Sequence, residues 1–452
     1  MRCWIGIDLG STTTKAVVLD EAGDVLGRGI TNSRSNYEVA CAIARAEAQN
    51  DVRFTLCARA LPDLGLEETE RAGLLDALER AFRFAQHEAQ LENLSAHFAE
   101  ETPHVEDLFP GKELVPVVEE ISAALRAEAG GQFAPGAERK SDFFRDLVAS
   151  EYHRHAKRRA CPERRPFEAL MAVFDKSILK AESRQVDLDF EHGAGRAIAR
   201  ALEETGLAES PVAPKLRDAL RASFTTDVEE VDAVGTGYGR ARLPFERRQI
   251  RSEILCHGLG AHAMFPGTRT VLDIGGQDTK AIQVDENGIV TSFQMNDRCA
   301  AGCGRYLGYI ADEMNLGLHE LGPLAKTSKA PVKINSTCTV FAGAEIRDRL
   351  TLGQKREDIL AGLHRAVMLR AMSLLARSGG VSDELTFTGG VARNETAVSV
   401  LHGLVEANWG ELTTNISPQS IYTGALGAAM FAQRGNPETE ESEETERTEA
   451  AA

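Results

Sequence analysis

The sequence has no excess of positive charge and no long apolar run. Its 452 residues contain 68 acidic and 51 basic side chains, a formal charge of −17 at pH 7. This balance argues against an electrostatic nucleic-acid binder, because such proteins neutralise phosphates with lysine and arginine. No uninterrupted stretch of about 18 apolar residues is present, and no basic leader precedes an apolar run at the N-terminus. We therefore expect a cytoplasmic protein with no membrane or nucleic-acid partner.

Cysteine is scarce and scattered. The eight cysteines run from Cys3 to Cys338. Secreted disulfide frameworks instead concentrate many cysteines in a short chain. Cysteines that lie close together in a cytosolic protein are more often metal or redox sites.

Hydrophobic patterning divides the chain into four segments. Residues 4–8, 16–20 and 24–31 read as strands of an antiparallel meander, and strand patterns return from Val231. Between them, apolar residues recur at helical spacing. We expect an α/β body, a mainly helical insertion and a disordered acidic tail. The expected bounds are residues 1–40 and 229–435 for the body, 41–228 for the insertion and 436–452 for the tail.

A polar turn that contains glycine follows the first strand. Asp8 ends the strand, and the next positions of interest are Gly10, Ser11, Thr12, Thr13 and Lys15. Such a turn can aim backbone N–H groups, hydroxyls and a lysine at phosphate oxygens while Asp8 holds a magnesium-bound water. Taken alone, the same residues also describe a tight hairpin with no ligand.

The order of strand, acid, glycine turn, threonine and lysine occurs a second time. Asp273 ends a strand and is followed by Gly275, Gly276, Gln277, Asp278, Thr279 and Lys280. Two such hairpins imply two duplicated halves around one cleft. A third element carries Gly389, Gly390 and Asn394, and glycines there let a backbone approach a nucleoside closely.

The three turns, in this order, resemble the phosphate-1, phosphate-2 and adenosine motifs of the actin, Hsp70 and sugar-kinase ATPase superfamily. The resemblance implies an α/β, actin-like ATPase with two RNase H-like halves, here with a large helical insertion, and it implies ATP and Mg²⁺ as ligands. Glu253 lies on the predicted helix that leads to the strand of Asp273. In that superfamily an acid at the matching place helps hold the attacking water, which makes Asp8, Glu253 and Asp273 the expected catalytic residues. The alternative for Glu253 is a solvated helix face.

Cys256 and His257 follow Glu253 on the same predicted helix. Adjacent residues on a helix point in different directions. We therefore expect both side chains to pack in the interior and not to form a metal pair.

Cys299 and Cys338 each stand behind a polar, capping-type residue and ahead of a helical pattern. A helix N-terminus lowers the pKa of a thiol and stabilises a thiolate and any anionic cluster that it binds. A [4Fe-4S] cluster generally takes four thiolates, so these two cysteines are at most half of a ligand set. The plain alternative is a pair of buried structural cysteines.

Residues 1–35 and 229–433 closely resemble the activator ATPases of 2-hydroxyacyl-CoA dehydratases and the ATP-binding subunits of benzoyl-CoA reductases. The shared stretches are GIDLGSTTTK, TGYGR, SEI with CH, DIGGQD, NDRCAAG, STCTVFA, TGGVARN, and SPQ with YTGALGAA. The resemblance implies that Cys299 and Cys338 bridge one [4Fe-4S] cluster together with two cysteines of an identical or related ATP-binding subunit. It also implies reduced ferredoxin as the electron donor and separate substrate-binding reductase subunits.

The helical insertion favours one branch of that family. Compact dehydratase activators lack it, and the larger ATP-binding subunit of benzoyl-CoA reductases has a similar insertion. We therefore expect an ATP-hydrolysing, electron-activating subunit of a dearomatising benzoyl-CoA reductase. The rivals are an activator of a 2-hydroxyacyl-CoA dehydratase, a small-molecule kinase of the same superfamily that needs no iron, and a non-redox binding module.

Cys303 stands where family members often have threonine. It follows Cys299 by four residues, and we expect the two on the same helix face. We favour an inert buried thiol, and the alternative is a third sulfur for the cluster.

A basic run interrupts the otherwise acidic insertion. Its members are Arg154, Lys157, Arg158, Arg159, Arg164 and Arg165. Such a run is usually a solvated face. The alternative is a docking site for an acidic partner subunit or ferredoxin.

Overall fold

The computed structural model describes residues 1–33, 36–137, 143–162, 164–183, 190–238, 245–296, 303–314, 316–334 and 339–435. The chain divides into two compact units. The sheet unit combines Arg2–Ala48 with Val228–Ala452, and the helical unit consists of Gln49–Asp227 together with Met1. The acidic tail expected in residues 436–452 lies outside the described residues.

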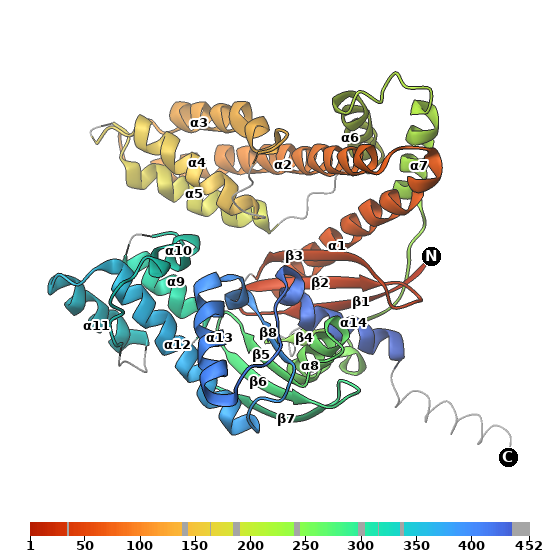
Figure 1. Cartoon of the computed structure of the whole chain (residues 1–452). Coiled ribbons are helices and arrows are strands. Elements are labelled where there is room, and N and C mark those ends of the chain that lie inside the picture. The colour runs from red at the N-terminus through yellow and green to blue at the C-terminus, as the bar shows by residue number, and fades with distance from the viewer. Residues whose placement is uncertain are drawn as a thin grey trace, which may run out of the picture. The chain divides into compact units, whose positions relative to one another are not determined.

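The first sheet begins with the antiparallel meander that the sequence predicts (Figure 1). β1 (Arg2–Leu9) pairs with β2 (Thr13–Leu19), which pairs with β3 (Val25–Asn32). β4 (Glu229–Gly237) lies parallel to β1, so the sheet order is β3-β2-β1-β4. β4 follows the helical unit in sequence. The pairing of β4 with β1 therefore joins two strands that are far apart in the chain.

The second sheet has the order β7-β6-β5-β8-β9. β5 pairs antiparallel with β6 and parallel with β8. The bounds are β5 (Thr270–Ile274), β6 (Thr279–Val284), β7 (Val290–Met295), β8 (Leu385–Thr388) and β9 (Thr414–Asn415).

The two leading hairpins share one register. Asp8 faces Lys15 across β1 and β2, and Asp273 faces Lys280 across β5 and β6. The repeated order of acid, turn and lysine in the sequence is therefore a repeated structural element.

Glycines let two helices pack closely in the sheet unit. They are α8 (Glu253–Met264) and α14 (Thr423–Arg434). A Cβ on Gly260 or on Gly427 would collide with the backbone of the facing helix. A Cβ on Gly6 of β1 would likewise collide with the backbone of α14. As a result α14 lies directly on β1, and α8 lies directly on α14.

The helices that follow β7 enclose one large apolar core together with β5 and β8. Their bounds are α9 (Gly304–Glu313), α10 (Leu321–Lys326), α11 (Thr339–Thr351), α12 (Arg356–Ser378) and α13 (Glu395–Trp409). Among the described residues, α12 alone is long and apolar enough to cross a membrane, but 61% of its most apolar stretch is buried in the protein. Leu363, Val367 and Leu375 belong to the core, which makes α12 an internal helix.

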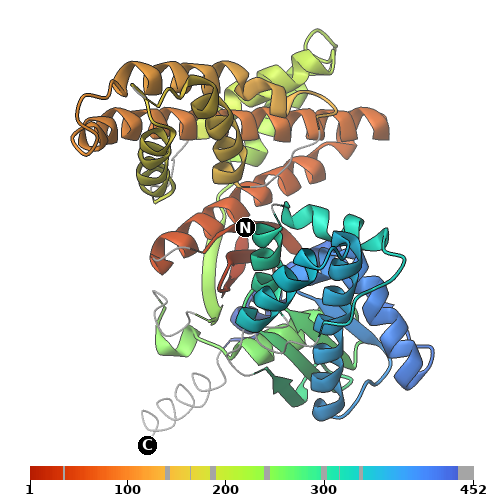
Figure 2. The same cartoon turned by 90° about the vertical axis from the view of Figure 1, so that its left-hand side faces the viewer.

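The helical unit is built along α2 (Glu68–Glu106), whose 39 residues span roughly 58 Å. The first part of α2 packs with α1, α6 and α7, and the later part packs with α3, α4 and α5 (Figures 1 and 2). Leu74, Leu78 and Phe82 recur at helical spacing and are buried. The bounds are α1 (Tyr37–Ala60), α3 (Val115–Glu128), α4 (Phe144–Arg159), α5 (Phe167–Glu182), α6 (Phe190–Glu204) and α7 (Ala213–Thr225).

Candidate active site

The three glycine turns lie against one another although they are far apart in sequence. A Cβ on Gly276, in the second turn, would collide with Thr12 Oγ1 of the first turn. A Cβ on Gly389, in the third turn, would collide with the carbonyl oxygen of Ile274 and lie 2.9 Å from Asp273 Oδ1. Gly389 also has a φ of +86°, which favours glycine.

The other expected binding residues lie on the same turns. Gly10 and Ser11 follow β1, while Thr13 and Lys15 belong to β2. Gly275 and Gln277 are half-buried in the turn between β5 and β6. A Cβ on Gly390 would meet no atom within 4 Å, so there is open space beside the third turn.

Asn394 is engaged by its own helix. Its Oδ1 accepts hydrogen bonds from the N–H groups of Thr396 and Ala397 and so caps α13. Its Nδ2 donates to His364 Nε2 at 3.0 Å, and His364 Nδ1 donates to the carbonyl oxygen of Leu360. Burial lowers the pKa of His364, which fits this neutral form. The amide oxygen and one amide hydrogen of Asn394 are therefore engaged within the protein.

Asp8 is buried at the end of β1, with 2% of its surface exposed. Its Oδ2 lies 3.5 Å from Lys15 Nζ. Its Oδ1 is buried without a hydrogen-bond partner among the described residues. A Cβ on Gly237 of β4 would lie 2.7 Å from Oδ1, so this position beside the oxygen has room for glycine only. Because an unpaired buried carboxylate oxygen is unfavourable, Asp8 Oδ1 is a fitting ligand for Mg²⁺.

Lys280 is fully buried among three carboxylates. Its Nζ lies 2.9 Å from Glu253, 3.2 Å from Asp273 and 2.8 Å from Asp278. Burial alone would lower the pKa of Lys280, but the three negative charges outweigh it and raise that pKa well above its usual value. The ammonium group is therefore a permanent charge at the base of the second turn.

Asp273 has both of its oxygens occupied. Thr388 donates to Oδ1 at 2.9 Å, and Lys280 donates to Oδ2 at 3.2 Å. Burial would raise the pKa of Asp273, but the charges of His257 and Lys280 and these hydrogen bonds lower it below its usual value. Asp273 thus differs from Asp8, which has an oxygen to offer.

Glu253 begins α8, the helix that leads to β5 as expected. The ion pair between Glu253 Oε1 and Lys280 holds this side chain against the second turn. The alternative of a solvated helix face is therefore not what the structure shows, since only 16% of the side chain is exposed.

His257 is buried as expected, and its ring also lies close to three acids. Its Nε2 lies 3.9 Å from both Asp8 Oδ2 and Glu253 Oε1, and its Nδ1 lies 3.6 Å from Asp273 Oδ1. The signal for this role was the spacing of Glu253 and His257, because residues four apart share a helix face. Cys256 points elsewhere, into a small apolar cluster.

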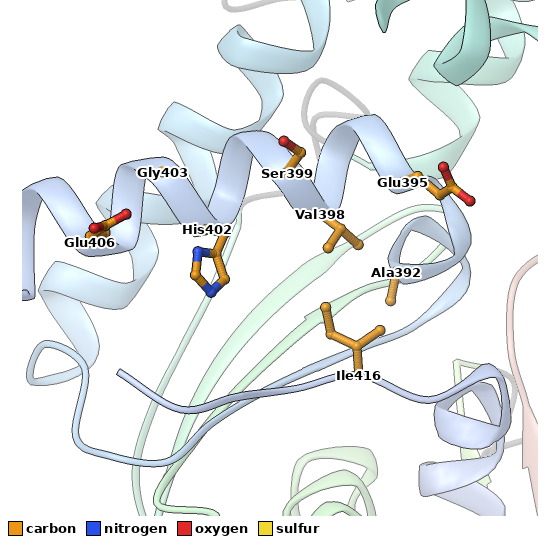
Figure 3. Close-up of a pocket in the computed structure, with 8 residues that line it drawn as sticks. All are labelled: Ala392, Glu395, Val398, Ser399, His402, Gly403, Glu406 and Ile416. Atoms are coloured by element: carbon orange, nitrogen blue, oxygen red, sulfur yellow. The ribbon is translucent and has the colours of Figure 1, made fainter. Parts of the chain in front are cut away.

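A shallow groove of about 560 Å³ follows the third turn along α13. Val398 and His402 of α13 face Ile416 across it (Figure 3). Ala392 also lines the groove, and it lies two residues after Gly390 of the third turn. The groove is open, and Ile416 lies on the side opposite α13.

The start of α9 is hydrogen-bonded to the second turn. The N–H groups of Gly304 and Arg305 donate to the carbonyl oxygens of Gly275 and Gly276, each at 2.8 Å. The guanidinium of Arg305 also donates to the carbonyl oxygen of Ser11 in the first turn, at 3.4 Å. One helix end therefore contacts both turns.

Cys303 directly precedes α9, and the expected helix face that it would share with Cys299 lies outside the described residues. It is fully buried, and burial raises the pKa of its thiol more than the nearby N–H groups of Tyr306 and Arg305 lower it. Cys299 and Cys338, the expected cluster ligands, lie outside the described residues. α11 begins at Thr339, directly after Cys338.

Two residues of the basic run form ion pairs within the helical unit. Arg154 forms ion pairs with Glu128 and Glu151, and Arg159 pairs with Glu120. Only part of the run, including Lys157 and Arg158, is exposed. A docking face would therefore carry less charge than the sequence suggests.

Comparisons with known proteins identify dehydratase activators and a benzoyl-CoA reductase subunit as relatives. The chain is 40% identical over 238 residues to the (R)-2-hydroxyglutaryl-CoA dehydratase activating ATPase of Acidaminococcus fermentans, a match that covers 52% of this chain and 88% of the relative. It is 44% identical over 208 residues to the 2-hydroxyisocaproyl-CoA dehydratase activator of Clostridioides difficile, covering 46% and 74%. One subunit of the benzoyl-CoA reductase of Thauera aromatica is 31% identical over 206 residues, covering 46% and 72%.

The fold is also found in a solved structure. The crystal structure of the Acidaminococcus fermentans (R)-2-hydroxyglutaryl-CoA dehydratase component A matches with a TM-score of 0.51 and 22% identity, over 96% of this chain and 98% of that one. The expected actin-like α/β fold is confirmed. The family described as the BadF/BadG/BcrA/BcrD ATPase family matches residues 5–432. This chain therefore belongs to the BadF/BadG/BcrA/BcrD ATPase family.

Proposed function

We propose that the three turns bind Mg²⁺ and ATP and that the chain hydrolyses ATP there. The observation that carries this proposal is the buried, unpaired Oδ1 of Asp8 beside the first turn. Mg²⁺ prefers carboxylate oxygens and water as ligands. Backbone N–H groups of the turns at Gly10 and Gly275 would bind the phosphates, and Lys15 adds a positive charge.

The three acids take different parts in this proposal. Asp8 offers Oδ1 to the metal. Glu253, held through one oxygen by Lys280, orients the attacking water. Asp273 has no uncommitted oxygen, so it acts by holding Lys280 and the third turn in place.

The hydrolysis would serve electron transfer. We propose that this chain activates a partner enzyme that acts on an acyl-CoA, by passing on an electron from reduced ferredoxin in the cytoplasm. When bound by Cys299 and Cys338 and by the matching cysteines of a second subunit, a [4Fe-4S] cluster supplies the one-electron carrier. The hydrogen bonds from Gly304 and Arg305 to the second turn support the proposal, because they join the nucleotide turns to the helix that follows Cys299.

A 2-hydroxyacyl-CoA dehydratase is the first candidate for the partner. The dehydratase activators are the relatives with the higher identity. A benzoyl-CoA reductase is the second candidate, and the relative from Thauera aromatica supports it. The helical insertion does not decide between them, because the matches to both kinds of relative cover about half of this chain.

Anaerobic purification of the full chain tests both levels of the proposal. We expect four iron atoms per two chains, Mg²⁺-dependent ATP hydrolysis, and ATP-dependent electron transfer from ferredoxin to a purified 2-hydroxyacyl-CoA dehydratase. Transfer to a benzoyl-CoA reductase component instead would select the second candidate. ATP turnover without any iron would overturn the electron-transfer function and leave the kinase alternative.

A further inference from the structure

His257 is placed where it can set the orientation of Asp8. The imidazole is buried, with 7% of the side chain exposed, and lies on α8 between the two acids that end β1 and β5. Its Nε2 side faces Asp8 and Glu253, and its Nδ1 side faces Asp273 at 3.6 Å and Thr423 Oγ1 at 3.4 Å. One ring nitrogen therefore faces the acid that ends β1, and the other faces the acid that ends β5.

The two oxygens of Asp8 have different surroundings. Oδ2 faces two nitrogen groups, Lys15 Nζ at 3.5 Å and His257 Nε2 at 3.9 Å. Oδ1 has no partner among the described residues. Attraction by the Lys15 ammonium, and by Nε2–H of a His257 ring that is protonated on both nitrogens, favours the carboxylate orientation in which one oxygen faces inward. The other oxygen, Oδ1, is then left for a ligand.

Gly424 keeps the space between His257 and Asp8 open. A Cβ at Gly424 would lie 2.7 Å from His257 Nε2 and 3.0 Å from Asp8 Oδ2. The close approach of α8 and α14 at Gly260 and Gly427 brings this part of α14 to the ring. The backbone of α14 at Gly424 therefore leaves room for the side chains of His257 and Asp8 to lie next to each other.

We propose that His257 is a positioning residue for the divalent cation of the nucleotide site. It holds Asp8 through Oδ2, so that Oδ1 binds the metal, and it is itself held by Asp273 and Thr423. Groups that orient a metal ligand commonly change metal affinity 10- to 100-fold when they are lost. This inference rests on the proposed ATP site, and it assigns a function to a side chain outside the expected catalytic set.

Two amide substitutions separate the two sides of the ring. His257→Gln keeps a polar group near the position of Nε2, which faces Asp8, whereas His257→Asn keeps one near Nδ1, which faces Asp273 and Thr423. His262→Gln is the matched control, because His262 lies on the same helix and contacts the loop at Gly288 instead of the acids.

The experiment measures Mn²⁺ binding to the full chain in the presence of a non-hydrolysable ATP analogue. Binding is detected as a decrease of the free Mn²⁺ signal in electron paramagnetic resonance. Binding of the analogue without metal and the melting temperature report on folding. We expect His257→Asn to weaken Mn²⁺ binding by about 10- to 100-fold and His257→Gln by less than about threefold, with metal-free binding of the analogue unchanged.

Equal losses in both amide variants, or no loss in either, would overturn the positioning role while the nucleotide site stands. No binding of Mn²⁺ with the analogue by the wild-type chain would overturn the proposed ATP site itself, and with it the role of His257. An effect of His262→Gln as large as that of His257→Asn would also overturn the inference, because it would reflect general damage to α8.

Discussion

The N–H group of Gly304 donates a 2.8 Å hydrogen bond to the carbonyl oxygen of Gly275. This bond joins the first residue of α9 to the second glycine turn, and Arg305 adds a bond to Gly276 and one to Ser11. A shift of either turn on binding or hydrolysis of ATP would therefore move the start of α9.

Arg305→Ala tests that connection. The backbone bonds to the second turn remain in this variant, but the side-chain bond to the first turn is lost. We expect ATP hydrolysis within about threefold of wild type and roughly tenfold weaker coupling, measured as the ATP-dependent release of iron to a chelator. Arg347→Ala is the control, because Arg347 is an exposed arginine that pairs with Glu313 near the other end of α9. Unchanged coupling in Arg305→Ala would show that the side chain is not part of the connection.

Gly276→Ala tests the contact between the first and second turns. Its Cβ would collide with Thr12 Oγ1, so the turns must separate, and we expect ATP affinity to fall by about tenfold or more, equivalent to roughly 1.4 kcal/mol. Gly73→Ala is the control, since its Cβ meets nothing within 4 Å and it lies on α2, outside the turns. Isothermal titration with an ATP analogue measures both. Similar affinities for the two variants would contradict the packing of the turns.

Glu253→Gln tests the proposed water-orienting acid. The amide can still accept a hydrogen bond from Lys280 but cannot act as a base, so we expect turnover to fall by about 10² or more with little change in ATP affinity. Steady-state hydrolysis and nucleotide titration separate these effects. Turnover near the wild-type rate would show that Glu253 does not act on the water and that its role is the structural ion pair with Lys280.

Asp273→Asn tests the buried ion pair with Lys280. The variant removes one of the three carboxylates around Lys280 and leaves Glu253 and Asp278, so we expect the free energy of unfolding to fall by about 2 kcal/mol. Because the folded pKa of Asp273 is lowered, its contribution is complete above the unfolded value of about 3.9 and is lost as the pH falls below it. Urea unfolding between about pH 3 and pH 8 should therefore show the difference between wild type and variant shrinking only at the acidic end. A difference that stayed constant throughout would contradict the lowered pKa.

Cys303→Ser should leave the iron content unchanged, whereas Cys299→Ser or Cys338→Ser should abolish it. Burial keeps Cys303 a neutral thiol, which is a poor cluster ligand. Iron determination and electron paramagnetic resonance on the three variants, purified without oxygen, provide the measurement. Loss of iron in Cys303→Ser alone would require a third sulfur from this chain.

Much of the proposed nucleotide site could be predicted because its signals are local. The end of a strand, an acid, a glycine turn and a lysine lie within eight residues in each hairpin, and the pairing of Asp8 with Lys15 and of Asp273 with Lys280 follows from the strand register. The buried helix faces of the insertion could also be predicted from the sequence. Leu74, Leu78 and Phe82, for example, recur at helical spacing and are buried.

Sequence alone did not decide which side chains are committed to partners from distant parts of the chain. The basic run looked like a uniform exposed face, but Glu128 and Glu120 of α3 pair with two of its arginines. Asn394 looked available to a nucleoside, but His364 of α12 and the start of α13 engage it.

The sequence by itself determined the fold class, the order of the motifs and the three turns, because strand alternation, glycine turns and helix periodicity are properties of short segments. Only the tertiary structure decided that His257 stands between Asp8 and Asp273 and that Asp8 keeps one oxygen unpaired. The physical reason is that these relationships depend on the packing of α8 on α14 through Gly260 and Gly427, and on β4 completing the first sheet from beyond the helical unit.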